Sequence, residues 1–522
     1  MPLATACDNL RARAHPRSPH ASPRHRTEAN TARRRDRFTV RERAERARAR
    51  TDQRGIVMPE DRNTEHKRTE TGRNVTWSPV SLLVVGICLV TIIADGYDVV
   101  VFGAVIPSLL REPGWHLTTA GAGVIGALAL LGMFVGSLTV GALTDRFGRR
   151  KTLIGCLAWF SVLTGLCAVT PSPEMFGLLR FVAGLGLGGV LPTATALTGE
   201  YSDRRSRNLV YAAMLSGFPL GGILAGFAGT HLIPEFGWHA MFLIGLVPLV
   251  LVVPVACLYL PESIVFLLAS GQRAEAEKIA ARWHVPLETQ VQVGKADVPA
   301  PASESDTGSP VARLFSRAYV RATVCFLPST FMCLFMIYGV NTWLPEIMRR
   351  AGYPLGSALS FLLVFNIGGA VGMLVVSLAA DRLGSKPILV ATFLLASTSV
   401  VLLSLRLPTA ALYTLVALGG VGTMGTQTFL LAYVSKHYPV RMGATAMGWT
   451  LGFGRLGSVL APPLLGLILG SGLAFRWDFY ALAVPGLLGA ALITLVPRAP
   501  GTRSADGREA PDTVSPVVEE AA

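Results

Sequence analysis

Four ionisable residues of this 522-residue chain stand inside long apolar stretches. Asp95 and Asp98 share one stretch, and Arg180 and Arg455 lie in two others. If these stretches cross a bilayer, an unpaired charge there costs on the order of 3 kcal/mol even on the lenient insertion scale, so such residues indicate a functional site. Carboxylates suit proton uptake and release, and a guanidinium suits the binding of an anion.

Asp95 and Asp98 are three residues apart, which puts both carboxylates on one face of a helix. Burial and mutual repulsion favour a proton on at least one of them, and a proton-coupling group needs this property. The alternative is a structural pair that bonds neighbouring helices. We interpret Asp95 and Asp98 as proton-coupling residues.

Arg180 lies about five residues into its apolar run, at a depth close to that of the two aspartates. This match predicts a carboxylate–guanidinium cluster that breaks when a proton or an anionic substrate arrives, with a static ion pair as the alternative. Arg455 stands near mid-depth and is the preferred anchor for a substrate carboxylate, because a guanidinium stays protonated and binds bidentately. The expected aromatic and polar lining, for which simple packing is the alternative, comprises Tyr338, Asn341, Trp343, Phe365, Asn366 and Trp449.

Charged residues are scarce in this chain, so the few that lie inside apolar stretches are candidates for a function. Hydrophobic residues form 51% of the chain and charged residues 15%, against roughly 25% charged residues in soluble domains. Apolar runs of about 20 residues predict membrane helices. Of the net charge of +14, residues 1–79 carry 19 − 10 = +9, which leaves +5 for the other 443 residues. The basic excess therefore belongs mainly to the N-terminal segment and does not indicate a nucleic-acid partner.

The apolar runs predict an all-α membrane protein with six helices, a polar stretch and six more helices. The expected parts are an N-terminal tail at 1–75, a bundle at 78–260, a cytoplasmic loop at 261–320, a second bundle at 321–497 and a tail at 498–522. The helices are expected near 80–110, 119–143, 152–170, 175–200, 207–232, 237–260, 322–346, 356–380, 387–406, 409–434, 443–470 and 474–496.

The N-terminal tail is rich in Arg, Ala, Pro, Ser and Thr and lacks aliphatic runs, so we expect it to be disordered. Three interpretations stay open: a lipid-anchoring tail, a nucleic-acid arm, or an over-long translation start with Met58 as the alternative. The C-terminal tail is expected to be solvated.

The two halves echo each other in sequence. GALTDRFGRRK at 141–151 follows the second run, and ADRLGSK at 380–386 follows the eighth. Such a repeat predicts two similar bundles that face a central site. Short loops on the side of residues 141–151 carry 11 Lys and Arg against 5 on the other side, which places both termini in the cytoplasm. Arg349 and Arg350 are exceptions on the outer side, either as an anion-attracting pair or as part of a solvated loop.

A cytoplasmic gate is predicted from charges near the inner ends of the helices, whose pairing changes between states. Glu200 is too far from Arg180 to pair with it, and Arg204 and Arg205 are its expected neighbours. The gate residues are Gly141, Asp145, Arg146, Gly148, Arg149, Arg150, Glu200, Asp381, Arg382 and Arg441.

The loop at 145–151, its weaker copy and the six-plus-six layout resemble the major facilitator superfamily. Within it, Asp95-Gly96-Tyr97-Asp98, Trp343-Leu344-Pro345 and the segment from Gly448-Trp449 to Gly457 resemble the aromatic acid:proton symporter family. The strings DGYDVVVFGAVIPSLL and IYGVNTWLP are most similar to its benzoate-transporter branch.

This resemblance implies import of a small aromatic carboxylate by proton symport through alternating access, in a monomer of the inner or plasma membrane with no cofactor. Two departures from the family pattern weaken the transfer of roles. Gly443 occupies the place of an expected arginine, with Arg441 two residues earlier, and the second loop lacks the double arginine.

Other functions stay open at this point. They are drug or metabolite efflux by proton antiport, uptake of a sugar or another organic acid, and a membrane sensor without transport. No pattern of residues in the sequence indicates an enzyme. A metal site is not indicated either, because the seven cysteines stand singly and form no Cys/His cluster.

Overall fold

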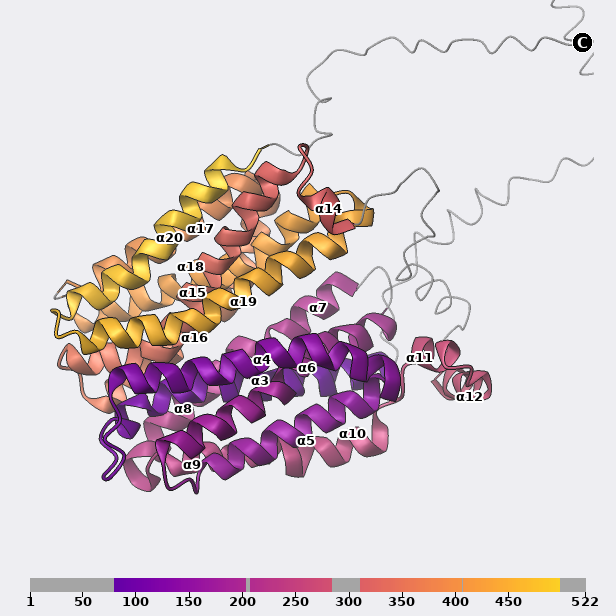
Figure 1. The fold of residues 1–522 in the computed structure, drawn as a ribbon, viewed down its shortest axis with the longest axis horizontal. Coiled ribbons are helices and arrows are strands. Elements are labelled where there is room, and N and C mark those ends of the chain that lie inside the picture. The colour runs from indigo at the N-terminus through magenta and orange to yellow at the C-terminus, as the bar shows by residue number, and fades with distance from the viewer. Residues whose placement is uncertain (1–78, 203–206, 284–309, 406, 498–522) are drawn as a thin grey trace, which may run out of the picture. The chain divides into compact units, whose positions relative to one another are not determined.

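The computed structural model describes residues 79–202, 207–283, 310–405 and 407–497, and these ranges form helices without a strand (Figure 1). The predicted all-α class is confirmed. The two predicted tails and the alternative start at Met58 lie outside the described residues.

The N-terminal half contains six long helical segments. They are α3 (Pro79–Leu109), α4 (Thr119–Phe147), α5 (Arg149–Cys167), α6 (Pro173–Glu200), α7 (Arg207–Leu215) continued by α8 (Gly217–Phe236), and a sixth segment made of α9 (His239–Leu243), η1 (Ile244–Leu246), η2 (Pro248–Val252) and α10 (Val253–Tyr259). The sixth segment changes its helical type near Pro248 and Pro254, because proline supplies no backbone N–H to the helix.

The C-terminal half contains six further long helices, and three short ones lie in the stretch that the sequence predicts as a polar loop. The long helices are α15 (Val320–Arg350), α16 (Leu355–Leu383), α17 (Ser385–Leu402), α18 (Thr409–His437), α19 (Val440–Gly470) and α20 (Arg476–Leu495). The short ones are α11 (Ile264–Ala269), α12 (Arg273–Trp283) and α14 (Pro310–Leu314).

Eleven helical segments of the described chain are long and apolar enough to cross a membrane. The twelfth long helix is α5, which begins with Arg149, Arg150 and Lys151. These three charges lower its mean hydropathy. The helix positions therefore agree with the predicted arrangement of six and six.

The internal repeat is also visible in backbone geometry. Gly148 ends α4 with φ +93°, and Gly384 ends α16 with φ +89°. Each N–H continues the preceding helix, to Thr144 O at 3.0 Å and to Ala380 O at 3.1 Å. Positive φ favours glycine, so the glycine shared by the two loops makes the same sharp turn in both halves.

The two bundles contact each other through α3 with α15, α4 with α19, and α8 with α16. Glycines allow the closest approaches, as is common between membrane helices. A Cβ on Gly103 would lie 1.9 Å from Asn341 O, and one on Gly123 would lie 2.5 Å from Pro462 O. These contacts lie toward the end where α3 and α19 finish and α4 begins, so the bundles are closed there.

Candidate functional site

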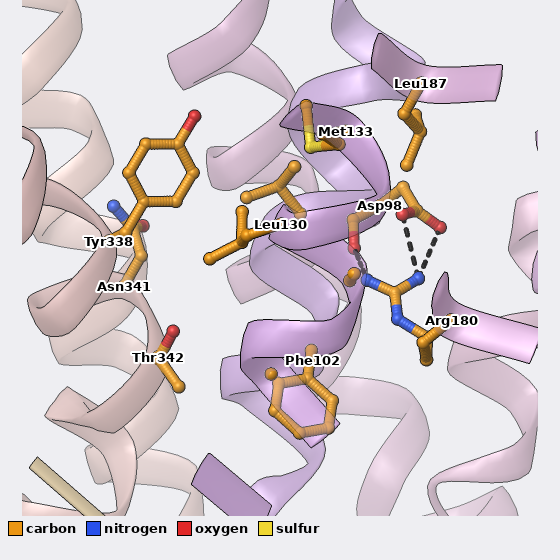
Figure 2. A pocket seen from close by; sticks show the side chains of 12 residues that line it. Asp98, Phe102, Leu130, Met133, Arg180, Leu187, Tyr338, Asn341 and Thr342 are labelled. Atoms are coloured by element: carbon orange, nitrogen blue, oxygen red, sulfur yellow. Dashed lines mark hydrogen bonds and ion pairs between the residues drawn. The ribbon is translucent and has the colours of Figure 1, made fainter. Parts of the chain in front are cut away.

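Asp98 of α3 and Arg180 of α6 form a buried ion pair (Figure 2). Arg180 Nη1 donates to the two carboxylate oxygens at 2.9 and 2.8 Å, and Nη2 donates to Asp98 O at 2.9 Å. The Thr164 hydroxyl of α5 donates to Asp98 Oδ1. Both charged residues are 1% exposed. The two charges are thus balanced within the N-terminal bundle, as the shared depth predicts. Thr164 was not predicted from the sequence, because one threonine in an apolar helix carries no signal.

Asp95, one turn earlier on α3, has a different environment. It is 5% exposed, and its Oδ1 has no hydrogen-bonding partner in the described part of the chain. Its carboxylate interacts electrostatically with Arg455 of α19, in the opposite bundle. Tyr338 of α15 is within electrostatic range of the same guanidinium. Although three residues apart, the two aspartates therefore have partners in different bundles.

Arg455 is partly buried, near the middle of α19. Among the described residues, no carboxylate lies within ion-pair distance of it. Its positive charge is therefore opposed at longer range by Asp95 and is available to an anion.

The Asp98–Arg180 pair lines a small cavity between the bundles. Figure 2 shows the pair on one side of this cavity and three residues of α15, namely Tyr338, Asn341 and Thr342, on the other. The cavity volume is about 10 Å³, which is room for about one water molecule. A larger ligand can enter only if the bundles move apart.

Asn341 of α15 and Asn366 of α16 are joined beside this cavity. Asn366 Nδ2 donates to Asn341 Oδ1 at 3.1 Å, and Asn341 Nδ2 donates to Ile337 O at 2.8 Å. Tyr338 packs on Phe218 of α8 with 6.3 Å between the ring centroids. The structure thus brings together three of the predicted lining residues.

The other three predicted lining residues lie elsewhere. The indole of Trp343 is fully buried and donates to Pro462 O at 2.9 Å. Phe365 lines a separate apolar cavity in the C-terminal bundle. Trp449 is 44% exposed and packs on Phe315, with ring centroids 6.1 Å apart. Their contact with substrate stays a prediction that this conformation does not support.

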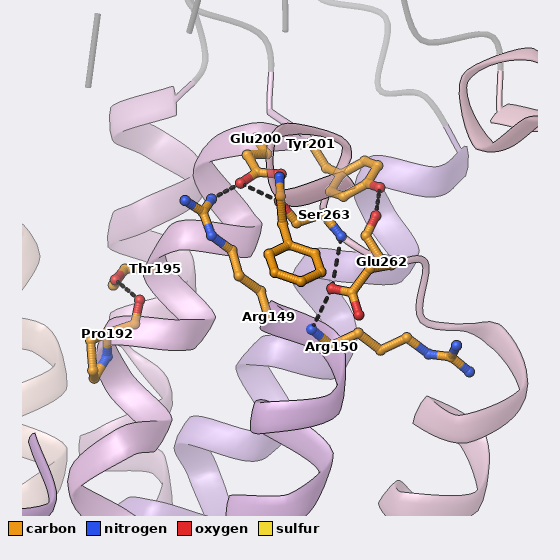
Figure 3. A network of polar contacts seen from close by, with 9 residues as sticks. Arg149, Arg150, Pro192, Thr195, Glu200, Tyr201, Glu262 and Ser263 are labelled. Carbon is orange, nitrogen blue, oxygen red and sulfur yellow. Dashed lines mark hydrogen bonds and ion pairs between the residues drawn. The ribbon is translucent and has the colours of Figure 1, made fainter. Parts of the chain in front are cut away.

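A polar network joins the first loop to the segment after the sixth span (Figure 3). Arg149 forms an ion pair with Glu200, and the Ser263 hydroxyl donates to the Glu200 oxygens at 2.9 and 2.7 Å. Glu262 Oε1 accepts from the backbone N–H groups of Arg150 at 2.9 Å and Ser263 at 3.0 Å. The network thus ties α5, α6 and α11 together.

Glu200 therefore pairs with Arg149, whereas Arg204 and Arg205, its expected neighbours, lie outside the described residues. Tyr201 extends the network by donating its hydroxyl to Glu262 O at 2.6 Å. Burial raises the pKa of Tyr201, which keeps this hydroxyl protonated as a donor. Sequence reasoning missed Glu262 and Ser263 as network members, although Pro261-Glu262-Ser263 directly follows the sixth apolar run.

The remaining predicted gate residues have fewer contacts. Asp145 is exposed and has no ion pair in the described ranges, and the exposed Arg146 lies 5.5 Å from the ring centroid of Phe147. Gly141 and Arg382 are exposed, and the side chains of Asp381 and Arg441 lie outside the described part. The predicted pairing of Asp145 is therefore not seen in this conformation.

Glu346, Arg349 and Arg350 form a charge cluster at the end of α15, in which Glu346 is buried and the two arginines are partly exposed. Arg349 donates to the two oxygens of Glu346 at 2.7 and 2.8 Å, and Arg350 Nε donates at 3.0 Å. Arg350 Nη1 also donates to Leu469 O at 2.6 Å. The two arginines therefore belong to the last turn of a helix and not to a loop, and both bind the same carboxylate. Attraction of anions stays a prediction. The i,i+3 and i,i+4 spacing was a signal for this pairing.

The chain is similar to known proteins over most of its length. The sequence profile of the Major Facilitator Superfamily matches residues 87–462 and 364–521. The benzoate transport protein of Acinetobacter baylyi is 35% identical over 424 residues, which are 80% of this chain and 90% of that protein. The gentisate transporter of Corynebacterium glutamicum is 36% identical over 416 residues, which are 79% and 87% of the two chains.

A solved structure shares the fold. The xylose transporter XylE from E. coli, in an inward-open conformation, matches with a TM-score of 0.66 at 16% identity, over 81% of this chain and 98% of that one. The three similar proteins are transporters and not enzymes.

Proposed function

Because the chain belongs to the Major Facilitator Superfamily, we propose that it imports a small aromatic carboxylate together with protons by alternating access. The relatives named for benzoate and gentisate support this substrate class. The single observation that carries the proposal is the relation of Arg455 to Asp95, an anion-binding group opposed by a buried carboxylate in the other bundle.

In this proposal the substrate carboxylate and the ionised carboxylate of Asp95 compete for the guanidinium of Arg455. While Asp95 is ionised, its charge satisfies Arg455 across the interface. A proton on Asp95 removes that charge, and the planar guanidinium of Arg455 then binds the substrate carboxylate. When Asp95 releases its proton, its carboxylate competes with the substrate and favours release. Coupling follows because the proton and the substrate favour the same state.

Asp98 has a positioning role in this scheme. Its carboxylate is held by Arg180 and Thr164, so it fixes α3 against α5 and α6 and keeps Asp95 directed at the opposite bundle. We assign proton transfer to Asp95 and the static ion pair to Asp98.

The network of Arg149, Glu200 and Ser263 is the proposed cytoplasmic gate on the N-terminal side. With both termini in the cytoplasm of the cell, the closed contacts of α4 with α19 lie at the outer face, so this conformation is shut toward the outside. We propose that the protein works as a monomer in the cell membrane.

Uptake of labelled benzoate and 4-hydroxybenzoate into proteoliposomes tests the proposal. An inward proton gradient is expected to drive accumulation above the level of protein-free liposomes, and a protonophore is expected to abolish it. Arg455→Gln is expected to remove uptake, whereas Arg273→Ala, on a side chain that is 82% exposed, is expected to retain it. Absence of uptake of both acids by an incorporated wild-type protein, or pumping of a lipophilic cation instead, would overturn the proposal.

A further inference from the structure

Asn366 carries a buried acceptor that no described residue satisfies. Its amide Nδ2 donates to Leu362 O at 2.9 Å and to Asn341 Oδ1 at 3.1 Å, which uses both hydrogens and leaves Oδ1 as the free atom. The residue is 0% exposed, and Oδ1 is without a partner in the part of the chain that the structure describes. An unpaired buried acceptor is costly, so its retention needs an explanation.

The amide of Asn366 is directed at the opposite bundle. A Cβ on Gly222 of α8 would lie 2.2 Å from Asn366 Oδ1, and the three nearest atoms to it all belong to the Asn366 side chain. While the bundles are packed, a larger residue fits there only if the Asn366 amide shifts. Gly222 therefore covers the acceptor in this conformation, and separation of α8 from α16 uncovers it.

Asn366 and Arg455 each lie near the middle of their helix, α16 and α19 respectively. Both residues therefore stand at the mid-depth of the C-terminal bundle, which is the depth of a substrate whose carboxylate binds Arg455.

Tyr338 of α15 lies between the two positions along the chain of contacts. It is within electrostatic range of Arg455 and stands one helical turn from Asn341, the partner of Asn366. Tyr338 and Asn341 both line the cavity between the bundles. An aromatic side chain and an amide pair thus lie together beside the cavity between the bundles.

We propose that Asn366 Oδ1, positioned by Asn341, accepts a hydrogen bond from a ring hydroxyl of the substrate, so that the transporter prefers ring-hydroxylated aromatic acids to benzoate. This inference rests on the proposed function and names its substrate class. The hydroxyl binds when Gly222 has moved away, and return of Gly222 covers the acceptor again and favours release. Benzoate leaves Oδ1 unpaired, which predicts a preference of about fivefold to tenfold in kcat/KM for the hydroxylated acid.

Uptake of labelled 4-hydroxybenzoate and benzoate by wild type and Asn366→Ala tests this selection. The ratio of the two kcat/KM values is expected to fall from about fivefold to tenfold in wild type to near one in the variant. A wild-type protein that moves both acids without preference overturns the inference but leaves the proposed function standing. A wild-type protein that moves neither acid overturns both. An equal loss for both acids in Asn366→Ala shows a structural role only and overturns the inference.

A second pair of substitutions tests whether Gly222 covers Asn366 Oδ1, independently of the comparison between the two acids. Gly222→Ala is expected to lower uptake of both acids strongly, because its Cβ meets the Asn366 amide and prevents closure. Asn366→Ala in the same chain is expected to restore benzoate uptake by removing the obstructing atoms. Gly226→Ala is the matched control, because its Cβ would meet backbone atoms of Leu363 at 2.9 Å and truncation of Asn366 does not relieve that contact. The assignment of Gly222 is overturned if Asn366→Ala restores benzoate uptake in neither Gly222→Ala nor Gly226→Ala, or restores it equally in both.

Discussion

Arg455 of α19 opposes Asp95 of α3 across the interface between the two bundles, without forming an ion pair at contact distance. One turn along α3, Asp98 is paired directly with Arg180 of its own bundle. The two aspartates thus differ in what a change of conformation does to them. Separation of the bundles alters the partner of Asp95 and leaves that of Asp98 intact.

Asp95→Asn is expected to uncouple transport from protons. Asparagine resembles the protonated carboxyl group, so Arg455 stays available to the substrate while no proton can be exchanged. Proton-driven accumulation of 4-hydroxybenzoate should fall at least about tenfold, and exchange of labelled for unlabelled substrate should persist. Counterflow in proteoliposomes measures both. Full accumulation by Asp95→Asn would assign the proton to another group.

Asp98→Asn is expected to destabilise the protein rather than to uncouple it. The substitution leaves the Arg180 charge buried without a counter-charge, which costs about 3–5 kcal/mol in comparable buried pairs. Thermal unfolding in detergent should show a lower Tm for Asp98→Asn and a partial recovery for the double variant Asp98→Asn with Arg180→Gln. If the two changes lower Tm additively, Asp98 and Arg180 do not stabilise each other.

Arg455→Lys is expected to weaken substrate binding while the charge is kept. A lysine ammonium cannot present the planar pair of donors that a carboxylate accepts, so KM for the aromatic acid should rise about tenfold. Initial uptake rates over a range of substrate concentrations measure this effect. Arg349→Lys is the control, since Arg349 binds Glu346 and stands away from the proposed site. An equal rise of KM in the two variants would speak against Arg455 as the anchor.

Glu200→Gln is expected to loosen the helices that follow the sixth span. The neutral amide loses the ion pair with Arg149 and weakens the hydrogen bonds from Ser263, which should free α11. Hydrogen exchange of the peptides covering 264–283 should therefore become faster. Arg273→Ala is the matched control, because its exposed pair with Glu277 contributes less than about 1 kcal/mol. Unchanged exchange in Glu200→Gln would remove this network from the gate.

Positions along the helices could be predicted well from the sequence. Apolar runs gave the helix limits to within a few residues, and a constant rise per residue gave the shared depth of Asp98 and Arg180. The depth of a residue in the membrane depends only on its position along its own helix, so it can be counted from the sequence without knowing how the helices pack.

The direction in which a side chain points around its helix was harder to predict. Helices that are apolar on all sides have no amphipathic face to orient them, so the different partners of Asp95 and Asp98 were not predictable. The bond between Asn341 and Asn366 and the cover by Gly222 depend on contacts between helices distant in sequence. Those contacts appear only when the bundles are assembled.

Substrate-driven proton movement tests the central claim most directly. Addition of 4-hydroxybenzoate to wild-type proteoliposomes without a pre-set gradient is expected to make the external medium more alkaline, beyond the change in protein-free liposomes, because each substrate anion enters with protons. Asp95→Asn should show no such change. Accumulation of labelled substrate by the wild type without external alkalinisation, or with acidification, would contradict proton symport through Asp95.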